Sequence, residues 1–184
     1  MAGIAGVGAA AGASARPFAV FAGIFNEHGA RMKSVAANLL GSFADAEDAV
    51  QDTFIKVHRS AATFRGQARV TTWIYRILLN TCYDQMRRHN RRAEDPLPPG
   101  LGAAAVALDH PLRLALEAEL RRLPDQERSA FLLCEVEGFS HREVGEILEV
   151  PEATSRTFLF RAKRRLQQAL RAGSEPVAGM GEGS

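Results

Sequence analysis

Cysteine is scarce in this sequence, and the positions of the two cysteines exclude two ways of stabilising a small fold. The 184 residues contain only Cys82 and Cys134. These two lack the paired spacing of a structural zinc site and the density of a disulfide scaffold. We therefore expect a protein of a reducing compartment, the cytoplasm, with no metal site.

Long hydrophobic runs are also missing. No stretch approaches the roughly eighteen consecutive apolar residues that a membrane span needs. The Ala- and Gly-rich start has no Lys or Arg before Arg16, which is atypical of a signal peptide. Because glycine raises the entropy cost of ordering a chain, we expect disordered tails over residues 1–17 and 173–184.

A dominant charge of one sign is absent as well. Lys and Arg number 23 against 21 Asp and Glu, a formal net charge of +2, so no protein-wide basic field indicates a nucleic-acid partner. The 5 histidines are scattered along the chain, and the sequence has no phosphate-binding glycine loop or nucleophile motif. These absences argue against an enzyme and against a bound cofactor.

The residues that are present predict helices. Glycine and proline gather in a few places instead of punctuating many short strands, which favours helices over a β-sandwich. Apolar residues recur at helical spacing over residues 18–25, 32–40 and 46–57, which predicts three amphipathic helices. A break at residues 41–44 leaves Ser42 or Asp45 to cap the third helix. A fourth helix is expected over residues 70–88.

A stretch rich in proline and glycine divides the chain in two. Its proline content blocks regular helix over residues 95–111, which indicates a flexible linker. A second helical unit follows over residues 112–172. We therefore predict an all-α protein of two small helical domains, residues 18–94 and 112–172, joined by this linker.

The second unit contains the pattern of a helix-turn-helix. Ser140 and Glu143 have the spacing of a capping box, which begins a short helix. A tight turn follows, and Pro151 stands where proline is tolerated, at the start of a longer helix. That helix, over residues 152–172, holds many basic residues against Glu152 alone. The second helix of such a motif docks in the DNA major groove, although a solvated basic helix with no ligand would show the same charges.

The first unit separates its charges in the same way. Helical spacing places Asp45, Asp48 and Asp52 on one side of the third helix, apart from its apolar side. No His or Cys stands at ligand spacing, which disfavours a metal site. A solvated face and a docking face for a basic partner remain the two alternatives.

Residues 60–92 reverse the sign, because seven arginines there oppose only Asp84. These arginines flank an aromatic run that contains Trp73 and Tyr75. Basic side chains interleaved with aromatic rings suit single-stranded or melted nucleic acid, in which cations follow phosphates and bases stack on rings. The alternative for Trp73 is a place in the hydrophobic core.

Taken in order, these segments resemble the extracytoplasmic-function (ECF) group of bacterial sigma factors. The resemblance covers roughly residues 18–172 and is carried by the segments DAEDAVQDTF (45–54), TWIYRILLN (72–80), LPDQER (123–128), EGFSHREV (137–144) and FRAK (160–163). Each motif is short, but their order is specific. The resemblance implies a dissociable, non-enzymatic subunit that carries core RNA polymerase to selected promoters. It divides the chain into sigma region 2 (18–94) and sigma region 4 (112–172).

The resemblance also implies roles for individual residues. The residues expected to dock on a coiled coil of the polymerase are Asp45, Asp48, Gln51, Asp52 and Phe54. Those expected at the minus-ten element, where Asn80 would hold a flipped base, are Phe64, Arg65, Trp73, Tyr75, Arg76, Asn80, Arg87 and Arg88. Those expected to read the minus-thirty-five element are Arg156, Thr157, Phe160, Arg161 and Lys163.

Two positions depart from the family's pattern. Ser155 stands where valine is common, and Phe158 stands where arginine is common. We expect Ser155 to loosen the packing of the recognition helix, because it removes apolar burial at a core-facing site. We expect Phe158 to remove a phosphate contact.

Regulation and assembly complete the expectations. The family implies a separate anti-sigma factor, and the chain is expected to be a monomer when free or bound to polymerase. The alternative from another class is a stand-alone helix-turn-helix regulator that binds duplex DNA without polymerase. That alternative leaves the acidic helix and residues 73–80 unexplained.

Overall fold

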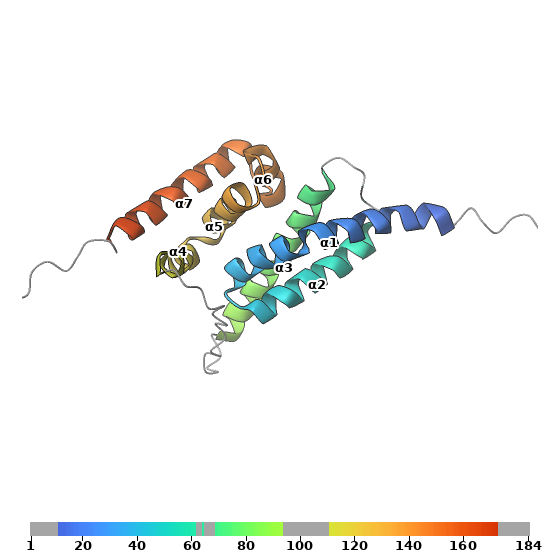
Figure 1. The fold of residues 1–184 in the computed structure, drawn as a ribbon, viewed down its shortest axis with the longest axis horizontal. Coiled ribbons are helices and arrows are strands. Elements are labelled where there is room, and N and C mark those ends of the chain that lie inside the picture. Colours follow the sequence, from blue (N-terminus) through green and yellow to red (C-terminus); the bar gives the residue numbers. More distant parts are fainter. Residues whose placement is uncertain (1–10, 62–63, 65–68, 94–110, 173–184) are drawn as a thin grey trace, which may run out of the picture. The chain divides into compact units, whose positions relative to one another are not determined.

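The structure, a computed structural model, describes residues 11–61, 64, 69–93 and 111–172. The chain divides into two units, residues 1–102 and 103–184. Every element of the described ranges is helical, which confirms the all-α expectation (Figure 1). The linker expected over residues 95–111 and the tail expected over 173–184 lie outside the described residues, except that Pro111 begins a helix.

The first unit is built from three helices. They are α1 (Ala11–Leu40), α2 (Phe43–Ser60) and α3 (Val70–Ala93), and each of the three contacts the other two. Their buried apolar residues are Met32, Val35, Ala36, Leu39, Ala46, Ala49, Val57, Ile74, Tyr75, Leu78, Leu79 and Cys82. The apolar faces expected from the sequence therefore meet in one core.

Helix α1 differs from the expectation of two separate helices. It runs unbroken for 30 residues, and Gly23 and Gly29 lie inside it. A glycine inside a helix costs only about 1 kcal/mol, and burial of Met32 and Val35 against the other two helices outweighs that cost. Helical backbone begins at Ala11, within the segment expected to be a tail.

The start of α2 follows the sequence expectation. Gly41 has a φ of 73°, which ends α1 in a conformation that favours glycine. The hydroxyl of Ser42 then accepts a hydrogen bond from the backbone N–H of Asp45 over 3.3 Å. Ser42 is therefore the N-cap, and Asp45 keeps its carboxylate for other contacts.

The second unit contains four α-helices and one π-helical turn in its described part. They are α4 (Pro111–Arg122), α5 (Asp125–Phe131), the π-helix η2 (Leu132–Val136), α6 (His141–Leu148) and α7 (Glu152–Ala172). Leu120, Leu123, Ala162 and Leu166 form a buried cluster that joins α4 to α7. The α-helix that begins at Asp125 thus passes directly into a π-helix.

The helix-turn-helix consists of α6, a tight turn and α7. Ser140 and Glu143 form the expected capping box at the start of α6. Glu149 ends α6 with a φ of 57°, in the left-handed region. Gly145 makes the turn possible, because a Cβ there would lie 2.8 Å from the carbonyl oxygen of Val150. Only glycine fits this position without displacing the backbone.

Candidate functional site

The acidic residues of α2 form an exposed face. Asp45, Asp48, Gln51 and Asp52 are all exposed, while the opposite side of the helix is buried against α1 and α3. Within the described part of the chain, no ion pair involves any of these three carboxylates. Unpaired carboxylates on one face leave their charge available to a basic partner.

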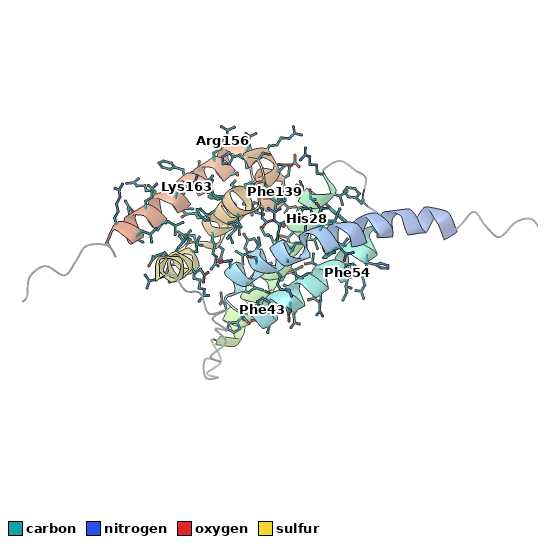
Figure 2. The ribbon with its side chains drawn as sticks, in the orientation of Figure 1. His28, Phe43, Phe54, Phe139, Arg156 and Lys163 are labelled. Atoms are coloured by element: carbon teal, nitrogen blue, oxygen red, sulfur yellow. The ribbon has the colours of Figure 1, made fainter. Side chains whose placement is uncertain are left out.

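Two exposed apolar side chains belong to this acidic helix, and neither is among the residues expected from the sequence to bind polymerase. Phe43 and Ile55 are each 45% exposed. Ile55 follows Asp48 and Asp52 at helical spacing, so the three share one face. Phe43 stands at the other end of α2 from Phe54 (Figure 2). Exposed apolar groups beside unpaired charges are typical of a protein interface.

Phe54 has a partner inside the first unit. Its half-buried ring packs edge-on against Phe25 of α1, with ring centroids 4.9 Å apart. Part of the ring is therefore used in holding α1 against α2. This packing role is additional to the polymerase contact that the family resemblance implies for Phe54.

The residues expected to bind the minus-ten element differ in burial: some lie in the core of the first unit and others on its surface. Tyr75 is only 1% exposed, so it belongs to the core and not to the exposed surface of the unit: it lies on the core-facing side of α3 beside Ile74 and Leu78. Trp73 is half-buried, and its ring centroid lies 4.9 Å from that of Phe64, which places Phe64 against the start of α3. Arg65 lies outside the described residues.

The exposed part of α3 carries the other expected residues. Asn80, Arg87 and Arg88 are exposed and Arg76 is half-buried. Arg87 forms an ion pair with Asp84 on the same helix. A hollow of about 390 Å³ has Asp45 of α2 and Arg88 of α3 in its lining. The two expected functions of this unit therefore meet at one end of the helices.

A hydrogen bond joins the acidic helix to α3. Nζ of Lys56 donates to Oγ1 of Thr81 over 2.9 Å, and that hydroxyl donates to the carbonyl oxygen of Ile77 over 2.8 Å. Thr81 follows Asn80 directly. This contact depends on how the two helices cross, so it could not be predicted from the sequence.

Helix α7 presents the expected minus-thirty-five residues to solvent. Arg156, Thr157, Arg161 and Lys163 are exposed, and Phe160 is 66% exposed. Arg156 pairs with Glu152 within the helix, and Lys163 pairs with Glu135 of η2 over 2.8 Å (Figure 2 labels both basic residues). These are exposed pairs of small net energy, which a phosphate can replace.

The two departures from the family pattern differ in their surroundings. Ser155 is fully buried, and its Oγ lies 3.3 Å from Nδ1 of His141. The expected loss of apolar burial is thus accompanied by a hydrogen bond that the sequence did not reveal. Phe158 is half-buried and does not extend the exposed basic surface.

Two further observations bear on function. Within the described ranges, no three His, Cys, Asp or Glu side chains gather into a group able to hold a metal ion. In the same ranges, no helix combines the length and the apolar character required to cross a membrane.

Comparison with known proteins decides the family. Residues 24–92 match the model of sigma-70 region 2, and residues 113–166 match that of sigma-70 region 4. The chain is 31% identical over 147 residues to the ECF RNA polymerase sigma factor SigM of Mycobacterium tuberculosis, which covers 80% of this chain and 75% of SigM. This protein belongs to the ECF sigma factors. The ECF sigma-E factor of Haemophilus influenzae is 32% identical over 164 residues, covering 79% of this chain and 87% of that one.

Solved structures agree with this assignment. The sigma factor RpoE of Bartonella quintana, in complex with the anti-sigma factor NepR, matches with a TM-score of 0.67 and 25% identity, covering 82% of this chain and 96% of that one. CnrH, solved with the cytosolic domain of CnrY, has the same TM-score of 0.67 at 23% identity, over 88% of this chain and 96% of CnrH, and shares the fold.

Membership of the family settles the general function. This sigma factor binds core RNA polymerase and directs it to promoter DNA, and it is an initiation factor without catalytic activity of its own. The match to region 2 accounts for the acidic helix and residues 73–80, so the stand-alone regulator is set aside.

Proposed function

We propose that this ECF sigma factor divides its work among three surfaces. The acidic face of α2 docks on a coiled coil of the core polymerase through Asp45, Asp48, Gln51 and Asp52. The exposed side of α3 captures the melted minus-ten element, with Asn80 holding a flipped base. Helix α7 reads the minus-thirty-five element in the major groove.

The observation that carries this proposal is the separation of charge by helix. Asp45, Asp48 and Asp52 of α2 are exposed and lack ion pairs within the described ranges, whereas α3 and α7 present mainly arginine and lysine. Acidic surfaces repel DNA and attract basic protein, and basic surfaces bind phosphates. Because the acidic and the basic faces belong to different helices of the first unit, one domain can hold polymerase and DNA together.

Each region contributes a modest contact. A few arginines on a small domain bind DNA weakly at physiological salt, because counterion release supplies only a limited free energy. Two such contacts on one polymerase combine through effective concentration. We infer that promoter selection requires regions 2 and 4 in the same chain. We also infer that one monomer of the sigma factor binds each polymerase.

A charge reversal on α2 tests the docking surface. Asp52→Lys should weaken binding to core polymerase by about tenfold or more, measured by fluorescence anisotropy of the labelled full chain, because a new positive charge faces a basic partner. Glu27→Lys on α1 is the matched control, since Glu27 is also exposed and the charge change is identical. Equal binding by Asp52→Lys and the wild type would contradict the proposal.

Regulation and location follow from the same role. We infer that the protein acts in the cytoplasm, where polymerase and chromosome lie, and that a separate anti-sigma protein restrains it, as NepR is solved in complex with RpoE of B. quintana. A tagged chain expressed in its own host should co-purify with a stoichiometric inhibitor. Recovery of core subunits alone under every growth condition would contradict this inference.

A further inference from the structure

Ser155 places a hydroxyl in the interior of the helix-turn-helix. The residue is 0% exposed and lies on the same side of α7 as Leu159 and Ala162. A buried hydroxyl requires a hydrogen-bond partner. Among the described residues, the side-chain partner of Ser155 is His141, whose Nδ1 lies 3.3 Å from the Ser155 Oγ.

His141 is held firmly at the place from which it reaches Ser155. It is the first residue of α6, directly after the N-cap Ser140, whose capping box with Glu143 fixes the start of that helix. Its ring is half-buried, and Nδ1 also lies 3.8 Å from Sγ of Cys134 in η2. One imidazole therefore connects three elements of the second unit.

The hydrogen bond supplies a directional contact that the apolar core lacks. Leu159, Ala162 and Leu166 anchor α7 by apolar burial, which is non-directional and tolerates a small rotation of the helix. A buried hydrogen bond has a narrow range of length and angle. Ser155 directly precedes Arg156 and Thr157, so the bond acts where the helix is expected to meet base edges.

We propose that His141 is a positioning residue for the recognition helix: its bond to Ser155 fixes the rotation of the first turns of α7, and with it the direction of Arg156 and Thr157. The proposal rests on the proposed role of α7 at the minus-thirty-five element. His141 acts through Ser155 and needs no contact with DNA.

Three substitutions distinguish the effect of the hydrogen bond from the effect of the volume of the His141 ring. His141→Asn keeps a polar δ atom close to the position of Nδ1, so it can still bond to Ser155. His141→Leu fills similar space without a polar atom. Ser155→Ala removes the hydroxyl from the other side and leaves the helix core otherwise intact.

The experiment measures run-off transcription by the full chain with core polymerase on two promoters that differ only in the minus-thirty-five element, one intact and one scrambled. The readout is the ratio of the two outputs. His141→Leu and Ser155→Ala should each lower this ratio about fivefold, the effect of one buried hydrogen bond. The double variant His141→Leu/Ser155→Ala should lower the ratio no further than either single variant, because each single variant has already lost the bond. His141→Asn should stay within about twofold of the wild type.

Other outcomes overturn the proposal in distinguishable ways. Two single effects that multiply in the double variant, or an unchanged ratio in His141→Leu, would show that the pair does not act as a unit. Equal losses of transcription on both promoters would show that His141 only supports folding. Thermal unfolding of each variant would then show a matching loss of stability. A wild-type ratio of one would remove the proposed role of α7 itself.

Discussion

Lys56 of α2 and Thr81 of α3 join these two helices of the sigma factor by a hydrogen bond of 2.9 Å between Nζ and Oγ1. Thr81 is buried and follows Asn80, the residue proposed to hold the flipped base. The contact therefore links the helix that is proposed to bind polymerase to the one that is proposed to open DNA. Lys33 makes the corresponding link from α1 to α2, through Glu47 over 2.7 Å.

Removing this link should affect promoter opening more than polymerase binding. Lys56→Met should lower stability by at most about 1 kcal/mol, because the lysine is largely exposed. It should slow opening of the minus-ten element about two- to threefold, followed by a fluorescent base analogue in the promoter. Lys33→Met is the matched control, and it should leave the opening rate unchanged. Equal opening rates in all three proteins would show that the link has no role in melting.

The turn of the helix-turn-helix should reject any side chain at Gly145. Gly145→Ala places a Cβ 2.8 Å from the carbonyl oxygen of Val150, and overpacking of this kind costs about 1–3 kcal/mol. Gly29→Ala is the control, because a Cβ there meets nothing within 4 Å. It should stabilise the protein by about 0.5–1 kcal/mol through helix propensity. Chemical denaturation measures both changes, and a neutral Gly145→Ala would contradict the close approach.

Glycine at position 149 should stabilise region 4. Glu149 is held at a φ of 57°, a conformation that costs a non-glycine residue roughly 1 kcal/mol. Glu149→Gly should therefore raise the free energy of unfolding by about 0.5–1 kcal/mol. Glu149→Ala removes the same carboxylate but keeps the Cβ. If the two variants are equally stable, the effect comes from charge and not from the backbone.

Cys82 should be unreactive in the folded protein. Burial raises the pKa of its thiol from 9.0 to about 12, so at pH 8 almost no thiolate is present to react. In a Cys134→Ser background, labelling with a thiol-specific disulfide reagent should follow global unfolding. Rapid labelling of the native protein would contradict the burial of Cys82.

The same shift makes stability depend on alkaline pH. Because the folded state holds the Cys82 proton more tightly than the unfolded state, this stabilisation is complete below about pH 9 and is lost as the pH rises from 9 towards 12. Wild-type protein should therefore lose more stability between pH 8 and pH 10.5 than Cys82→Ala. Parallel losses in denaturation experiments would contradict this prediction.

Local sequence signals predicted the helix ends well. The caps at Ser42 and Ser140 are contacts between residues three positions apart, so the sequence contains all of their parts. The junction at η2 is different, because there the backbone N–H of Glu137 bonds to the carbonyl of Leu132, five residues earlier. Side-chain periodicity does not reveal such a change of backbone register.

Two features of the candidate site could not be predicted from the sequence, and for the same physical reason. The aromatic and basic run around Tyr75 predicts a DNA contact, but the crossing of α3 over α1 and α2 turns this side chain into the core. Ser155 was expected only to weaken packing, whereas His141, 14 residues earlier, provides a partner. Both depend on tertiary contacts between helices, which the pattern within one helix does not determine.

The measurement that tests the central claim most directly is run-off transcription with purified bacterial core polymerase over a promoter library, using the wild-type chain and the variant Asp48→Lys/Asp52→Lys. The account predicts promoter-specific transcripts that require both promoter elements and that vanish in the variant. Transcripts that persist undiminished in the variant would contradict docking through the acidic face of α2, and transcripts indifferent to the minus-thirty-five element would contradict the role given to α7.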